Sequence, residues 1–198
     1  MNRAQMSIHS LIRRVIRRDR LQGGTVPADS GVRGKSGLAG GVASIFARLD
    51  AAGSLRLRRS DGCTAKEIAA VRSHFAHDLP PEYQQFLRRA GRGAGKLFQG
   101  SAIYYPELLE LQQAAKELLI ENGGTLSLPE GAMVFFMHQG YEFCFLQPTT
   151  ADPPVFQYVE GQDGFANPWD RFSGFLEDAV ADHLRAWPNL NSSVGANP

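Results

Sequence analysis

The sequence has few residues of the kinds that build covalently or metal-linked folds. Only two of its 198 residues are cysteines, Cys63 and Cys144, and they form neither a CxxC pair nor a metal-ligand spacing. Cys144 lies in an apolar run, which is typical of a small core residue. We therefore expect two unpaired thiols in a reducing, cytoplasmic compartment, and neither a metal nor another cofactor.

Long apolar runs are also missing. No stretch of about 18 apolar residues occurs, so the sequence predicts no membrane-spanning helix. The positive charges near the N-terminus are not followed by the apolar segment and cleavage site of a secretory signal. An apolar content of 43% is ordinary for a globular protein, and the length fits one domain with additional segments.

The total charge of the sequence is close to zero, but the charges are unevenly distributed along it. The net charge is +1, but residues 1–60 hold 12 Lys/Arg against 3 Asp/Glu, a net of +9. Residues 61–198 hold 9 Lys/Arg against 17 Asp/Glu, a net of −8. A field of one sign governs partner choice and association rate rather than fold. The sequence thus combines a basic head (residues 1–60) with an acidic body.

Motifs for nucleotide chemistry are absent as well. GVRGKSG has two residues between its first glycine and the glycine before lysine, where a phosphate-binding loop has four. GRGAGK follows a predicted helix and so lies at its negative end, whereas phosphate loops precede a helix. We interpret the second run as a helix stop and a loop.

The histidines do not predict a catalytic or metal site. His74 and His77 are spaced for one helix but lack a third ligand, so we expect them to be structural or solvent-facing. His138 and Glu142 are interpreted as a hydrogen-bonded hairpin pair, with an acid–base pair as the alternative. No nucleophile elbow or HExxH motif occurs, and we predict that the protein is not an enzyme.

The basic head is predicted to contain a helix, a Gly-rich linker and a second short helix. The first helix has an apolar stripe of Ile8, Leu11, Ile12, Val15 and Ile16. Its other side carries the four head arginines, Arg13, Arg14, Arg17 and Arg18. We expect the stripe to cover the protein's own domain; contact with a membrane surface or nucleic acid is the alternative. VASIFARLDAAG is predicted as a short helix that packs onto the body.

The body, residues 61–187, starts with two predicted helices. In TAKEIAAVRSHFAHD, Thr64 and Glu67 match a capping box. In LPPEYQQFLRRAG, Pro81 suits the first turn, where its missing N–H costs nothing. Gly91 is placed for a left-handed C-cap.

The remaining body alternates strands and helices. KLFQGSAIYY predicts one or two short strands, PELLELQQAAKELLIENGG predicts a helix, and two apolar runs joined near Gln139-Gly140 predict a hairpin. VFQYVEGQ is a further strand, and WDRFSGFLEDAVADHLRAW is a final helix. Strands adjacent in sequence favour an α+β fold, in which a central antiparallel meander packs against α-helices. Residues 188–198 are predicted to be a flexible tail.

These pieces, in this order, resemble the SUKH superfamily, the Smi/Knr-type cell-wall assembly regulators and their bacterial relatives. The matching pieces are LPPEYQQFLRRAGRG, LPEGAMVFF, YEFCFL, VFQYV and WDRFSGFLEDAV, and they span residues 62–187. The resemblance implies an α+β fold without known enzymatic activity in most members. Bacterial members are often immunity proteins that neutralise a toxin, and fungal members are regulatory scaffolds. The basic head lies outside the pattern, and HQGYE lacks the acidic–glycine cluster often found at that turn.

We therefore predict a protein-binding module, foremost an immunity protein whose acidic body suits a cationic toxin domain such as a nuclease. A regulatory scaffold is the alternative, and an enzyme or small-ligand module is a third hypothesis. The candidate contact residues are Glu107, Glu110, Tyr141, Glu142, Glu160, Asp163, Trp169 and Asp170. For the two aromatic residues of this set, Tyr141 and Trp169, core packing is the alternative role.

Overall fold

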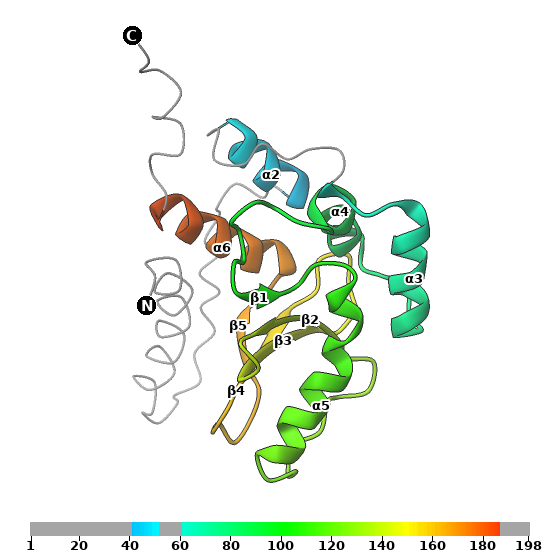
Figure 1. Cartoon of the computed structure of the whole chain (residues 1–198), viewed down its shortest axis with the longest axis vertical. Coiled ribbons are helices and arrows are strands. Elements are labelled where there is room, and N and C mark those ends of the chain that lie inside the picture. The colour runs from blue at the N-terminus through cyan, green and yellow to red at the C-terminus, as the bar shows by residue number, and fades with distance from the viewer. Residues whose placement is uncertain (1–40, 52–60, 187–198) are drawn as a thin grey trace, which may run out of the picture.

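A computed structural model describes residues 41–51 and 61–186 of the chain. The predicted basic helix, the Gly-rich linker and the C-terminal tail lie outside these residues. The described part contains an antiparallel sheet packed against helices (Figure 1), so the predicted α+β fold is confirmed.

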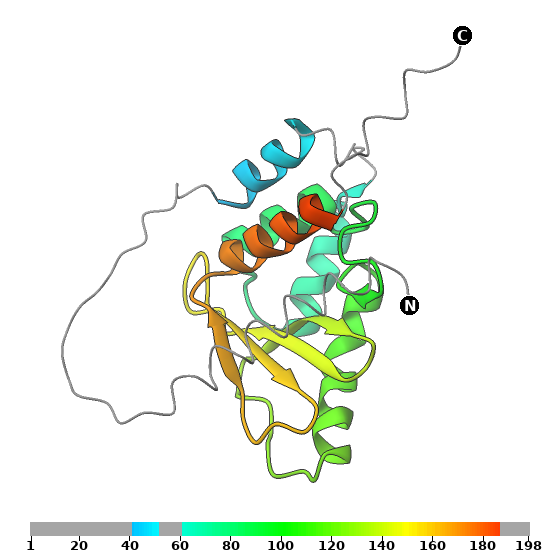
Figure 2. The ribbon, with the colours of Figure 1, turned by 90° about the vertical axis from the view of Figure 1, so that its left-hand side faces the viewer.

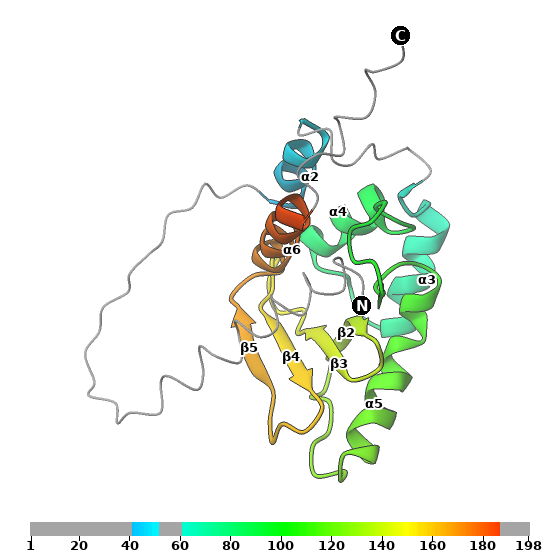
Figure 3. The same ribbon diagram turned by 60° about the vertical axis from the view of Figure 1, so that its left-hand side comes forward.

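The sheet is a five-stranded meander in which each strand pairs with the next one along the chain. Figure 3 shows the strands that follow the first one lying side by side. Gln139 and Gly140, between the second and third strands, have φ values of 48° and 77°. Positive φ at both central positions is the type I′ turn that matches the twist of paired strands, so the predicted hairpin is confirmed. The strands are β1 (Ser101–Ala102), β2 (Met133–His138), β3 (Glu142–Leu146), β4 (Val155–Val159) and β5 (Ala166–Trp169).

Helices α2, α4 and α6 pack on one another beyond one end of the sheet (Figure 2). Helix α3 packs against α4, and α5 lies against β2. A single 3-10 turn, η2, precedes α5. The helices are α2 (Val42–Ala51), α3 (Ala65–Phe75), α4 (Pro81–Ala90), η2 (Glu107–Leu109), α5 (Leu111–Glu121) and α6 (Phe172–Ala186).

Local signals fix most helix ends. Thr64 and Glu67 form the predicted capping box of α3, and Pro81 is the first residue of α4. The predicted left-handed cap at Gly91 is wrong, because its φ is −65°. Space is the reason for this glycine: a Cβ there would lie 2.5 Å from both the Cys63 Sγ and the Leu87 carbonyl oxygen.

Helix α2 belongs to the same core as the body, as its apolar pattern predicts. Val42, Ile45, Phe46 and Leu49 are at most 1% exposed. The carboxylate of Glu82, in the first turn of α4, accepts a 2.6 Å hydrogen bond from the Val42 N–H at the start of α2. Glu82 thereby accepts from one of the N–H groups in the first turn of α2, which have no partner within the helix.

A β-bulge in β2 turns two consecutive aromatic side chains toward α6. Val134 pairs with Phe145 and Phe136 pairs with Cys144, which leaves Phe135 as the extra residue. The Phe135 ring centroid lies 5.3 Å from that of Phe172, and the Phe136 centroid lies 5.7 Å from that of Phe175. The bulge therefore builds an aromatic core that strict alternation along a strand would not give.

The side chain of Gln112, in α5, closes the open edge of β2. Its Nε2 donates to the Ala132 carbonyl at 3.0 Å, and its Oε1 accepts from the Val134 N–H at 3.0 Å. Because β1 pairs only with residues 137 and 138, the first half of β2 would otherwise present bare backbone groups. A glutamine amide substitutes for a neighbouring strand here.

Replacing Gln112 with alanine is expected to lower the free energy of unfolding by about 1–2 kcal/mol, because the buried Val134 N–H loses its acceptor. Urea denaturation measures the change. Gln113→Ala is the matched control: its side chain is exposed and bonds only to Glu117 within the helix, so its effect should stay below about 0.5 kcal/mol. Equal losses in both variants would contradict the edge-capping role.

Candidate partner-binding surfaces

Two loops meet at one end of the sheet and bring together three of the predicted contact residues. Glu142, at the start of β3, pairs with Val159, at the end of β4, so the β2–β3 turn adjoins the β4–β5 loop. The Glu160 N–H donates to the Tyr141 carbonyl at 2.8 Å. Tyr141 is half-buried, while Glu160 and Asp163 are exposed. Together with Glu142, these residues are called the hairpin end below.

Glu142 lies beneath this surface and is only 2% exposed. Its Oε1 accepts a 2.8 Å hydrogen bond from Gln157 Nε2, whereas its Oε2 has no partner within the described part of the chain. Burial raises the pKa of Glu142 to about 7, and the Gln157 hydrogen bond opposes this shift. Burial also raises the pKa of Tyr141 at the surface above, and the Glu142 charge adds to that increase.

His138 stands opposite Glu142 in the strand register. Its Nδ1 lies 2.8 Å from the Ser101 hydroxyl, and its ring packs edge-on against Tyr141 at a centroid distance of 5.7 Å. The predicted neighbourhood of His138 and Glu142 is thus present, but the hydrogen bonds described for them run to Ser101 and Gln157. These bonds tie the β2–β3 turn to both neighbouring strands.

The other predicted contact residues lie elsewhere. Glu107 and Glu110 are exposed around η2, ahead of α5. Helix α5 continues this exposed side with Glu117 and Glu121 and with Ile120, whose side chain is 71% exposed. This is a second acidic surface, separate from the hairpin end.

Trp169 is part of the interior, and Asp170 lies at the opposite end of the sheet from Tyr141. The Trp169 indole N–H donates to Asp178 at 3.0 Å, and the ring packs edge-on against Phe175 at 5.1 Å. Trp169 is 7% exposed and therefore belongs to the core, which is the alternative role predicted for it. We leave Trp169 out of the contact surface because its polar and apolar atoms are already engaged within the domain.

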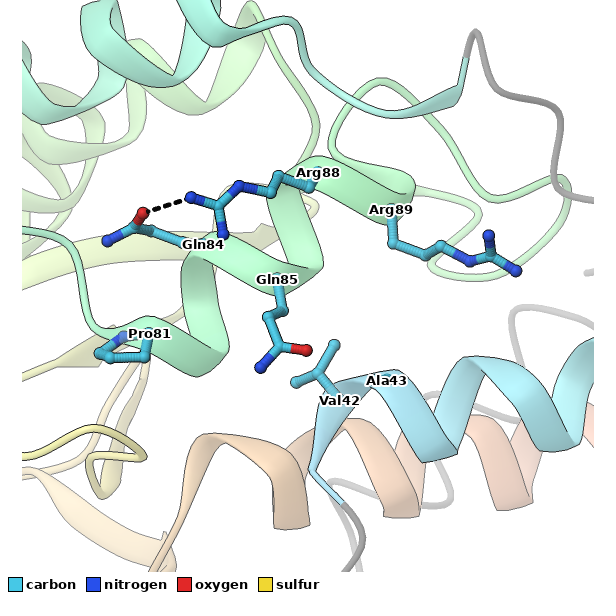
Figure 4. A pocket seen from close by; sticks show the side chains of 7 residues that line it. All are labelled: Val42, Ala43, Pro81, Gln84, Gln85, Arg88 and Arg89. Atoms are coloured by element: carbon cyan, nitrogen blue, oxygen red, sulfur yellow. Dashed lines mark hydrogen bonds between the residues drawn. The ribbon is translucent and has the colours of Figure 1, made fainter.

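An open groove between α2 and α4 was not predicted from the sequence (Figure 4). It has a volume of about 740 Å³. Arg88 donates to Gln84 at 2.9 Å along its wall, and Arg89 pairs with Asp50 of α2. The lining residues are Val42, Ala43, Pro81, Gln84, Gln85, Arg88 and Arg89.

The groove and the hairpin end lie at opposite ends of the sheet. The Glu82 N–H, in the first turn of α4, donates at 3.1 Å to the carbonyl of Ala151, in the β3–β4 connection. That connection leaves the end of β3 farthest from Tyr141. The periodicity of α2 predicts its buried side but not which helix it meets, so the sequence carries no signal for the groove.

Within residues 41–51 and 61–186, no cluster of three or more His, Cys, Asp or Glu side chains is arranged to hold a metal ion. His74 and His77 are exposed. The predicted unpaired state of the two cysteines is confirmed: both thiols are buried and free, and burial raises the pKa of Cys63 to about 11. None of the helices placed by the structure is long and apolar enough to cross a membrane.

Residues 62–178 match a sequence model of the SMI1 / KNR4 family (SUKH-1). The chain belongs to this family. The match starts at Gly62, ahead of α3, and ends within α6, so α2 lies outside it. No curated protein gives a significant match. Membership in SUKH-1 supports a protein-binding module of the immunity or Smi/Knr type, and such proteins are generally not enzymes.

Proposed function

We propose that this SUKH-1 domain is an immunity protein that neutralises a cationic toxin domain, which it contacts through the hairpin end. The contact between Tyr141 and Glu160, in the loop that also carries Asp163, supports this proposal, as does the net charge of −8 on residues 61–198. A nuclease toxin is a fitting partner because its cleft is built to receive phosphate. Exposed carboxylates on the inhibitor offer the same charge.

Charge and shape contribute differently to such a complex. Exposed acidic side chains attract a cationic partner and raise the association rate, and salt screens this effect. Lasting contact needs a rigid anchor, and tyrosine supplies large contact area at low entropic cost. Tyr141 fits that role because its ring packs against His138 and its backbone is held by Glu160.

Reversing the two exposed charges, in Glu160→Arg/Asp163→Arg, is expected to slow association with the toxin domain by about tenfold or more at low salt. The partner to test is the inactivated toxin encoded by the neighbouring gene, and surface plasmon resonance gives the rate. Asp170→Arg is the control, because it reverses an exposed acidic residue at the opposite end of the sheet. Equal slowing in the control would refute the assignment to the hairpin end.

The pairing itself is tested in cells. Co-expression of this protein with the neighbouring toxin should restore growth, and the double charge-reversal variant should protect less. Continued killing despite soluble wild-type protein would refute that pairing.

A regulatory scaffold is the second candidate function, and the α2–α4 groove supports it. Arg88 gives the groove a cationic group beside the Arg89–Asp50 ion pair, whereas the hairpin end is acidic, and the two lie at opposite ends of the sheet. Two surfaces of different charge suit two different partners. A ternary complex detected by mass photometry would favour the scaffold over the immunity function.

A further inference from the structure

The α2–α4 groove has one wall inside the family match and one wall outside it. Helix α4 lies within the matched residues 62–178, whereas α2 precedes them. Figure 4 shows Gln85 of α4 pointing toward Val42 of α2. The proposed toxin contact uses the hairpin end, at the other end of the sheet, so the chemistry of whatever occupies the groove is a separate question.

Arg88 brings to the groove a positive charge that no carboxylate among the described residues balances. Its guanidinium donates to the neutral Oε1 of Gln84 at 2.9 Å, and its side chain is exposed. The other arginines on helices α2, α3 and α4, which are Arg48, Arg72 and Arg89, each pair with a carboxylate. A guanidinium carries five N–H donors, so Arg88 keeps donors for an anionic group from outside the domain.

The side chain of Arg88 is also held in place. Gln84, which accepts from Arg88, donates through its Nε2 to the Leu79 carbonyl at 2.7 Å, so both halves of its amide are fixed. Figure 4 shows the guanidinium of Arg88 lying along α4 toward Gln84. A restrained arginine loses less side-chain entropy on binding, and its planar fork matches the two oxygens of a carboxylate.

The helix N-termini that border the groove already have acceptors of their own. The Val42 N–H, at the start of α2, donates to the Glu82 carboxylate at 2.6 Å, and the Glu82 N–H donates to the Ala151 carbonyl at 3.1 Å. Pro81, the first residue of α4, has no N–H. This end of the groove is therefore apolar and presents the exposed side chains of Pro81 and Ala43.

The distance between the apolar end and the guanidinium sets the spacing of a ligand that contacts both. Pro81 and Arg88 are seven residues apart on α4, which corresponds to about 10 Å along the helix axis. An extended peptide covers this distance in about three residues. A groove of about 740 Å³ that is open to solvent suits a short chain segment.

We propose that the α2–α4 groove binds an acidic peptide segment of a partner protein. A carboxylate of the segment contacts Arg88, and an apolar side chain at the spacing given above contacts Pro81 and Ala43. A lone phosphate would satisfy the guanidinium but leave the apolar end uncovered, which favours a peptide. This assignment goes beyond the proposed function, because it uses a surface other than the toxin contact.

Selection of random peptides displayed on phage tests the assignment with the full chain. Peptides that also bind the full-length Arg88→Glu variant are removed in each round. This step discards peptides held only by the basic head, because both proteins carry it. We expect the surviving peptides to contain Asp or Glu about three positions from an apolar residue.

A substitution on the other wall provides an independent readout, because the selection itself already depends on Arg88. The peptide recovered most often is synthesised, and fluorescence anisotropy gives its Kd. Ala43→Asp should weaken binding by about tenfold or more, because it places a like charge in the groove. An acidic residue in the first turn of α2 suits the helix dipole, so the fold should be kept. Ser44→Asp is the matched control: this neighbouring residue is exposed but does not line the groove, so its effect should stay below about threefold.

Amide shifts in the full chain locate the bound peptide, and we expect them at residues 42–43 and 81–89. The assignment is overturned if no peptide survives the removal step, if the survivors lack Asp and Glu, or if the shifts centre on the hairpin end. It is also overturned if Ala43→Asp binds as tightly as the wild type, or if inorganic phosphate at the same concentration displaces the peptide, which would identify a general anion site. The toxin plays no part in these readouts, so failure of the proposed function would leave them unchanged.

Discussion

Replacing Gly62 with alanine is expected to lower the free energy of unfolding by about 3 kcal/mol or more. A Cβ at this position would lie 2.8 Å from the carbonyl carbon of Arg88 and closer still to its oxygen. The chain cannot move aside, because the Cys63 N–H donates to Leu87 and the Arg92 N–H donates to Asp61, both at 2.8 Å. These two hydrogen bonds hold residues 61–63 against the end of α4.

Chemical denaturation of the two full chains measures the effect. Gly174→Ala is the matched control: it lies inside α6, and no atom within 4 Å opposes the new methyl group. Alanine has the higher helix propensity, so this variant should gain about 0.5–1 kcal/mol. A Gly62→Ala protein as stable as the wild type would show that residues 61–63 can shift away from the end of α4 at little cost in free energy.

Gly62 and Gly91 illustrate what a sequence pattern leaves out. A glycine after a helix predicts a left-handed cap, but Gly91 has a φ of −65°, and a thiol and a carbonyl group leave no room there for a Cβ. The conflict involves Cys63, which is far away in sequence. Non-local contacts of this kind leave no local signal.

The elements that could be predicted are those whose cause is local. The capping box of α3, the proline at the start of α4 and the turn at Gln139-Gly140 each need only neighbouring residues, and all three are confirmed. The predicted helix at 106–121 is instead divided into η2 and α5, and the last helix begins at Phe172 rather than Trp169. Ala166–Trp169 forms β5 because β4 offers it a partner, although its sequence, ANPW, lacks strand alternation.

The candidate site was partly predictable for the same reason. Tyr141 and Glu142 adjoin a predictable turn, but their proximity to Glu160 depends on the β3–β4 register. Burial in β3 does not follow the alternation of strand faces, because all five residues from Glu142 to Leu146 are buried. Tyr141 and Asp170 lie just outside their strands and reach the surface.

Glu142→Gln is expected to stabilise the protein at pH 8 and to have little effect near pH 4. Burial raises the pKa of this carboxyl from about 4.5 to about 7, so the folded state holds the proton more tightly than the unfolded state. The stabilisation that protonation confers is complete below about pH 4.5 and is lost as the pH rises through about 7. At pH 8 the free energy of unfolding of the wild type should therefore be about 3 kcal/mol lower than that of the variant.

The measurement is urea denaturation of both full chains across this pH range. Gln keeps an acceptor for the amide of Gln157, so the change removes the charge and leaves the hydrogen bond. Glu160→Gln is the control, because an exposed carboxylate should show no such pH dependence. If the wild type and Glu142→Gln keep a constant difference from pH 4 to pH 8, Glu142 is not held in a protonated, buried state.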